Sequence, residues 1–148
     1  MFTQHRLKNG LRVILIPNKS TLAVSLLVLV KVGSRHESGS ESGISHFLEH
    51  LMFKGTKRRP TTQIISQELD ALGAEYNAFT SKDHTGYYIK AEYAHLPLIA
   101  DVLSDMLMES IFVPEEIARE RGTILEEINM YEDNPMAQVG NFFESDLF

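Results

Sequence analysis

The chain has 148 residues, of which 43% are hydrophobic, and a formal net charge of −6 at pH 7. This length supplies one ordinary hydrophobic core, so we expect one domain, or part of one, over residues 1–148. The acidic balance argues against a nucleic-acid partner, because phosphate contacts need clustered basic side chains. The absence of cysteine excludes disulfides, thiolate metal ligands and cysteine nucleophiles.

The apolar segments argue against a membrane protein and against a secreted one. The longest apolar run, Thr21–Val30, is too short to span a bilayer, and the first ten residues lack the apolar centre of a signal peptide. We therefore expect a cytoplasmic protein with no membrane segment.

The first third of the chain predicts two strands, a loop and a helix. Gly10–Pro17 is short and β-branched, and Leu22–Ser34 is almost continuously apolar, which predicts a central strand covered on both faces. The glycine-dotted stretch Gly33–Gly43 predicts a loop. A helix is expected over roughly residues 43–54, with Ser42 as its N-cap.

The rest of the chain predicts helices on either side of a strand pair. Apolar periodicity, turn residues and prolines place a helix at 62–72, strands within 74–92 around a turn at 81–83, and helices at 95–110, 114–133 and from 136 onward. The predicted fold class is therefore α+β, with an antiparallel or mixed sheet covered by helices in two layers.

The helix expected at 43–54 carries His46, Glu49 and His50 in the pattern His-x-x-Glu-His. Each residue of an α-helix advances about 100°, so the three side chains leave the same face. Two imidazoles at this spacing can bind one Zn²⁺, and a carboxylate beside them can take the proton of a water on the metal. The pattern is the inverse of the commoner motif His-Glu-x-x-His. Its alternative explanation is chance in an ordinary helix.

A catalytic zinc site needs a third protein ligand, which without cysteine must be a histidine or a carboxylate. The helix expected after Pro114 is the densest source of carboxylates. On helical angles, Glu120 and Glu127 share one flank of it, and Glu126 lies on the opposite face. Glu127 is thus either a ligand with Glu120 hydrogen-bonded behind it, or an ordinary flanking carboxylate.

The same helix shows an apolar stripe, which we expect to be its buried face. The stripe consists of Ile117, Ile124, Ile128 and Tyr131.

Three stretches carry a resemblance to a known family: GISHFLEHLMFKGT at residues 43–56, NAFTS at 77–81 and ARERGTILEEINMYEDNP at 118–135. They closely resemble the first domain of the insulinase and mitochondrial-processing-peptidase family, zinc peptidases with the His-x-x-Glu-His motif. The likeness is greatest to bacterial members of the processing-peptidase branch. The resemblance implies a processing-peptidase-like metallohydrolase domain, incomplete at its C-terminus, that hydrolyses peptide bonds.

The resemblance also implies roles for individual residues. It makes His46, His50 and Glu127 the ligands of one Zn²⁺ and Glu49 the base that activates water. Spacing alone would allow Glu126 as the third ligand, but the family has a second glutamate seven residues before its ligand, which pairs Glu120 with Glu127. The segment formed by Asn77, Ala78, Phe79 and Thr80 is similar to the edge strand on which the family lays an extended peptide. From its residues alone, this segment is merely a strand with an aromatic side chain.

Family members have two similarly folded domains that enclose a chamber. We therefore expect residues 1–148 to be the N-terminal, zinc-binding part of a larger two-domain chain, or to need a second homologous subunit, with a dimer as one possibility. Alone, the chain is expected to be a weak or inactive zinc-dependent endopeptidase acting on unfolded peptides. The alternative is a non-catalytic scaffold or core subunit of the same fold, which typically loses part of the motif. A lyase such as S-ribosylhomocysteinase shares the motif but takes a cysteine ligand, which this chain lacks.

Overall fold

The fold combines two antiparallel sheets with five α-helices in the described residues, 1–147 of a computed structural model. The strands are β1 (Thr3–Arg6), β2 (Arg12–Leu15), β3 (Ala23–Val30), β4 (Glu75–Thr80) and β5 (Thr85–Glu92). The helices are α1 (Ile44–Leu51), α2 (Thr62–Asp70), α3 (Leu96–Glu109), α4 (Pro114–Glu132) and α5 (Pro135–Leu147), with short 3₁₀ turns at Ser34–His36, Gly39–Glu41 and Tyr93–His95. The expected α+β class is confirmed.

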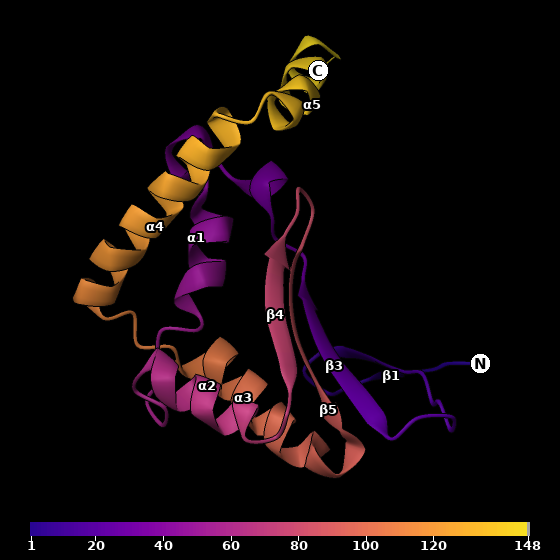
Figure 1. The fold of residues 1–148 in the computed structure, drawn as a ribbon. Helices are drawn as coiled ribbons and strands as arrows, with labels where there is room; N and C mark the ends of the chain where they lie inside the picture. Colours follow the sequence, from indigo (N-terminus) through magenta and orange to yellow (C-terminus); the bar gives the residue numbers. More distant parts are fainter. Residues whose placement is uncertain (148) are drawn as a thin grey trace.

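The main sheet has the order β3-β5-β4, and all its pairings are antiparallel. β1 and β2 form a separate two-stranded sheet. In Figure 1, α2 and α3 lie together near one end of the main sheet, and α1 stands between β4 and α4. α1 therefore has a strand on one side and a helix on the other.

The hydrophobic core lies where α2 and α3 meet β5. Alternate apolar residues of β5 point toward these helices, and apolar side chains at helical spacing on the helices pack against them. The fully buried members are Ile65, Leu69, Ile89, Ile99, Val102, Leu103 and Met106. The core therefore fixes β5 and, through it, the neighbouring strand β4.

The prediction that Leu22–Ser34 is a central strand covered on both faces is wrong. β3 lies at an edge of the main sheet, and β5 occupies the centre. Along β3, partly buried Val24, Leu26 and Val28 pack against the core, while Leu27 and Leu29 are exposed. A continuous apolar run indicates that neither face is polar, but it cannot tell an edge strand from a central one.

The helix expected at 43–54 is present, but it is shorter and starts differently. Its N-cap is Gly43, with a φ of 86°, rather than Ser42. The Glu37 carboxylate accepts hydrogen bonds from the backbone N–H groups of Gly43 and Ser45, at 2.7 and 2.9 Å. A carboxylate from the preceding loop thus replaces a local cap at the positive end of α1.

Among residues 1–147, no helix combines the length and the apolar character needed to cross a membrane.

Candidate metal centre

Five side chains interleave between α1 and α4, which run antiparallel side by side (Figure 1). In spatial order they are Lys54, Glu120, His50, Glu127 and His46. We call this set the charged ladder. His46, His50 and Lys54 are spaced four residues apart, and Glu120 and Glu127 seven apart, so each set projects from one face of its segment.

Three ligand atoms of the ladder converge on one point. His46 Nε2 and His50 Nε2 are 3.1 Å apart, and Glu127 Oε2 lies 3.8 and 3.7 Å from them. The point equidistant from these atoms lies about 2.1 Å from each, which is an ordinary Zn–N or Zn–O bond length. Two imidazoles and one carboxylate also suit zinc by donor type. The residues present therefore fit a zinc ion with three protein ligands.

Glu120 decides which nitrogen of His50 faces this point. Its Oε1 accepts a hydrogen bond from His50 Nδ1 at 2.7 Å, so Nδ1 carries the proton and the Nε2 lone pair is free for a metal. Burial alone would raise the pKa of Glu120, but hydrogen bonds from Lys54 and His50 hold it below the ordinary value. Only 4% of Glu120 is exposed, and it is the single buried residue of α4 among the described residues.

Glu49 faces β4 rather than α4. Its Oε2 accepts a hydrogen bond from the Thr80 hydroxyl at 2.5 Å. The pKa of buried Tyr87 on β5 is raised to about 12, first by burial and then by the charge of Glu49. Glu49 therefore lies on the same helix as His46 and His50, with its carboxylate directed at Thr80 and with no ion pair to a basic side chain among the described residues.

The segment Asn77–Thr80 lies in β4, at the edge of the main sheet that faces α1. The backbone N–H of Ala78 donates to the Asn77 side-chain oxygen at 2.9 Å. Phe79 is partly exposed, and its ring lies against Gly86 of β5. The outer edge of β4 thus keeps backbone groups open to another extended chain.

The stripe predicted to be the buried face of α4 is only half right. Ile117 and Ile124 are partly buried, but Ile128 and Tyr131 are exposed by 45% and 50%. The helix is rotated so that Glu120 and Glu127 face the histidines of α1, and ionic contacts replace apolar ones there. Glu126, the alternative ligand, is exposed and outside this cluster.

Two contacts of the site were not anticipated from the sequence. One is the Lys54–Glu120 ion pair at 2.6 Å, and the other is the hydrogen bond from Thr80 to Glu49. Lys54 continues the spacing of four from His46 and His50, which is the signal that could have revealed it. Thr80 is expected in the peptide-binding segment, and its hydroxyl is directed at Glu49.

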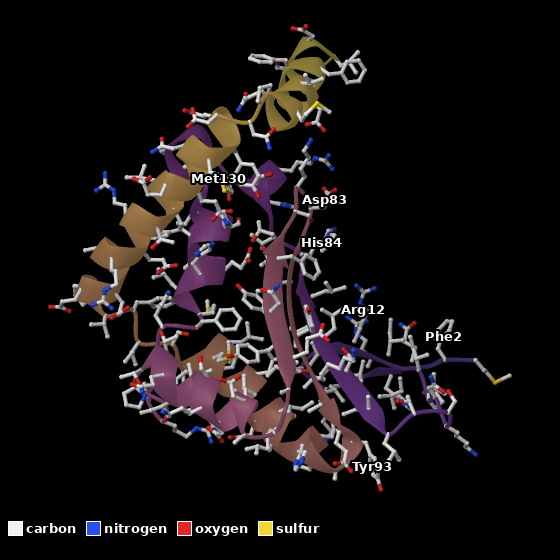
Figure 2. The ribbon with its side chains drawn as sticks, in the orientation of Figure 1. Phe2, Arg12, Asp83, His84, Tyr93 and Met130 are labelled. Atoms are coloured by element: carbon white, nitrogen blue, oxygen red, sulfur yellow. The ribbon has the colours of Figure 1, made fainter. Side chains whose placement is uncertain are left out.

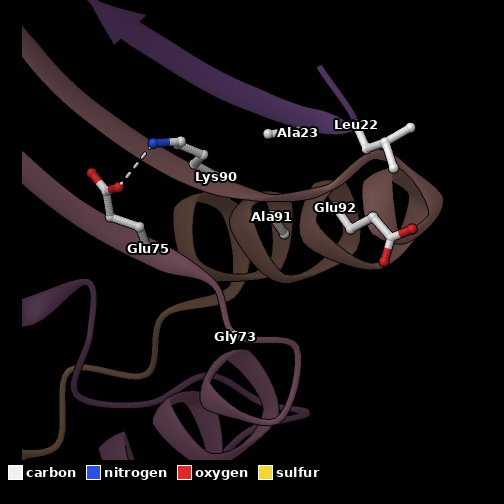
Figure 3. A pocket seen from close by; sticks show the side chains of 7 residues that line it. All are labelled: Leu22, Ala23, Gly73, Glu75, Lys90, Ala91 and Glu92. Atoms are coloured by element: carbon white, nitrogen blue, oxygen red, sulfur yellow. Dashed lines mark hydrogen bonds and ion pairs between the residues drawn. The ribbon is translucent and has the colours of Figure 1, made fainter.

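A separate hollow of about 380 Å³ lies at the other end of β4 and β5 (Figure 3). Glu75 and Lys90 pair across it at 3.2 Å, and Leu22, Ala23, Gly73, Ala91 and Glu92 complete its lining. It is open to solvent and contains none of the ladder residues, so it is not part of the candidate centre.

Comparison with known proteins places this geometry in a family. The sequence profile described as "Insulinase (Peptidase family M16)" matches residues 12–148. The chain belongs to the insulinase family. A solved structure titled as a protease from Helicobacter pylori superposes with a TM-score of 0.88 at 33% identity, covering 93% of this chain and 33% of that one.

Two bacterial proteins are also similar in sequence. "Uncharacterized zinc protease YmxG" of Bacillus subtilis is 42% identical over 91% of this chain and 33% of its own length. A protein of Streptomyces coelicolor, also named an uncharacterized zinc protease, is 42% identical over 96% of this chain and 31% of its own length. The chain therefore spans about a third of the length of these relatives.

Proposed function

We propose that this chain is the zinc-binding part of a metalloendopeptidase that hydrolyses peptide bonds of unfolded peptides. The observation that carries the proposal is the convergence of His46, His50 and Glu127 on one point at zinc-bonding distance. Glu49 lies on the same helix as the two histidines. The names of the relatives support zinc as the metal.

Each residue of the site has a separate task in this proposal. His46, His50 and Glu127 would hold the zinc ion, which would supply Lewis-acid polarisation of the scissile carbonyl. Glu49 would accept a proton from the water that attacks this carbonyl and would deliver it to the leaving amine. Thr80 orients the Glu49 carboxylate, and Glu120 keeps His50 in the tautomer that ligates.

The peptide is proposed to add to the outer edge of β4 as an extended strand. Asn77, Ala78, Phe79 and Thr80 would then supply backbone hydrogen bonds and side-chain contacts. The Asn77 side chain, which now accepts from the Ala78 N–H, would have to release that group to the peptide. An extended peptide at this edge would run beside α1 and pass Glu49.

Because the chain spans a third of its relatives' length, we propose that a second homologous domain or subunit completes the substrate chamber. The chain alone is expected to bind zinc and to cleave a fluorogenic peptide weakly or not at all. A non-catalytic scaffold of the same fold is the competing function, and the presence of both histidines and both Glu49 and Glu127 favours the peptidase.

The test is zinc stoichiometry of the purified chain after dialysis, with Glu127→Gln compared with its neighbour Glu126→Gln. The wild type and Glu126→Gln are expected to retain about one zinc per chain. Glu127→Gln should lose more affinity than the 10- to 100-fold typical of a residue that only supports a ligand. If zinc loss follows Glu126 instead, the ligand assignment is wrong.

A further inference from the structure

Lys54 sits at the end of the charged ladder with its ammonium against a buried carboxylate. Its Nζ lies 2.6 Å from Glu120 Oε2, while the other oxygen, Oε1, accepts from His50 Nδ1. The Lys54 side chain is only 24% exposed, and that of Glu120 is 5% exposed. The two oxygens of Glu120 therefore have one partner each, on opposite sides of the carboxylate.

This division of partners has a mechanical consequence. A carboxylate turns freely about its last bond unless both oxygens are held. With Oε2 fixed by the ammonium, Oε1 is aimed at His50, and the imidazole ring is held in one orientation and one tautomer. A buried carboxylate without the ammonium would also be costly to keep in place, because it would lose a charge-assisted hydrogen bond.

We infer that Lys54 is a positioning residue for the metal site, which acts on His50 through Glu120 and so raises the affinity for zinc. The inference rests on the proposed zinc function of His46, His50 and Glu127. Lys54 itself does not touch the metal, the substrate or the reacting atoms.

A positioning role and a purely electrostatic role for Lys54 predict opposite changes in zinc affinity when the ammonium is removed. Removing a positive charge near a divalent cation should tighten cation binding if charge alone matters. Removing a residue that orients a ligand should weaken it, by an amount typical of supporting partners, 10- to 100-fold. Zinc affinity of a Lys54 variant therefore separates the two roles by direction.

The experiment compares Lys54→Met, which keeps the length of the side chain but removes the ammonium, with Lys54→Arg and a surface control. Lys57→Met is the matched control, because Lys57 pairs with Glu109 near the surface and its side chain is 72% exposed. Zinc affinity is measured on the full 148-residue chain by competition with a chromogenic chelator. We expect about tenfold weaker binding for Lys54→Met and changes of less than about twofold for Lys54→Arg and Lys57→Met. Unchanged or tighter binding by Lys54→Met would overturn the inference.

A double-mutant cycle tests whether Lys54 acts through Glu120. In the Glu120→Gln background, adding Lys54→Met should leave zinc affinity unchanged, because the carboxylate that Lys54 holds is gone. An independent, additive loss would contradict the inference. The double variant also serves if Lys54→Met alone does not fold, since it contains no buried carboxylate in need of the ammonium.

Nitrogen-15 chemical shifts of the His50 ring, recorded without metal, give a readout that does not depend on zinc. The wild type should show the Nδ1-protonated tautomer, and Lys54→Met should show a mixture; an unchanged tautomer would refute the inference. If the wild-type chain binds no zinc, the proposed function fails, while this measurement still shows whether Lys54 holds His50 in one tautomer through Glu120.

Discussion

Asp105 lies on α3, and its carboxylate has no exposed surface. Three residues of the loop after α1 donate hydrogen bonds to it. Thr56 and Arg59 donate to its Oδ2 at 2.6 and 2.8 Å, and Arg58 donates to its Oδ1 at 3.1 Å. Burial alone would raise the pKa of Asp105, but these hydrogen bonds together hold it below the ordinary value. The contact ties the segment that follows α1 to the core.

Replacing Asp105 with Asn should destabilise the chain by about 3 kcal/mol at pH 7, because the buried Arg59 guanidinium loses the one fully buried carboxylate among its partners and Arg58 loses one of its two carboxylates. The folded pKa of Asp105 lies below the unfolded value of about 3.9, so its contribution is present above that value and is lost as the pH falls through the folded pKa. The difference between wild type and variant should therefore shrink below about pH 4. Urea unfolding as a function of pH measures it.

Asp83→Asn is the matched control for Asp105→Asn. Asp83 pairs with Arg35, but both side chains are more than half exposed, so the change should cost less than about 1 kcal/mol. Equal effects of the two substitutions would show that the buried network is not a special source of stability.

Residues that share a short helical segment were accessible from the sequence, and their distant partners were not. His46, Glu49 and His50 lie on one helix face, so their meeting follows from helical geometry. The separation of 77 positions between His50 and Glu127 carries no geometric information without the family resemblance. The hydrogen bond from Thr80 to Glu49 depends on how β4 packs beside α1, which no local pattern encodes.

At the scale of elements, the loop before α1 is joined to the turn between β4 and β5. Backbone N–H groups of Ser34 and Arg35 donate to the carbonyl oxygens of Ser81 and Lys82, at 3.3 and 2.9 Å. Figure 2 shows Asp83 and His84 at this turn. A Cβ added to Gly33 would lie 2.1 Å from the Ser81 carbonyl oxygen, so only glycine allows this approach. The contact links the loop that leads into α1 to the strand that carries Thr80.

Gly33→Ala should destabilise the chain by about 2 to 3 kcal/mol, because backbone atoms must move apart to admit the methyl group. The free energy of unfolding in urea gives the measurement.

Gly39→Ala provides the comparison for Gly33→Ala, since a Cβ at Gly39 meets no atom within 4 Å and its φ is not in the left-handed region. We expect it to change the stability by less than about 1 kcal/mol. A Gly33→Ala variant as stable as Gly39→Ala would mean that the loop and the turn can separate without cost.

The periodicity of the sequence predicted well where helices and strands begin and end. It did not predict which neighbours each of them packs against. The strands within 74–92 and the helices at 62–72, 95–110 and 114–133 are present near their expected bounds. The errors concern what each element faces: β3 lies at an edge, and α4 turns carboxylates inward instead of Ile128 and Tyr131. Apolar pattern predicts a buried face only where the partner is apolar, and the partner of α4 is a row of histidines and a lysine.

At the scale of the whole molecule, zinc binding should stabilise the folded chain. An ion that binds only the folded chain adds stability according to its concentration, about 2.7 kcal/mol at one hundred times the dissociation constant. We expect the unfolding midpoint in urea to rise with added zinc and to fall back with a chelator. Glu127→Gln should abolish this response, and Glu126→Gln should preserve it. An unfolding midpoint of the wild type that does not change with added zinc would contradict binding at this site.

The antiparallel order of the charged ladder also fixes how far α1 and α4 can slide along each other. Two apolar helix faces can often shift by a turn and still pack, because one leucine resembles another. Here Lys54 lies at one end, His50 in the middle and His46 at the other end. Glu120 lies between the first two, and Glu127 lies between the two histidines. A shift that brought Glu120 to the place of Glu127 would leave Lys54 without its carboxylate. The pairing thus sets the register of the two helices, as a single polar pair does in a coiled coil, and it does so before any ion arrives.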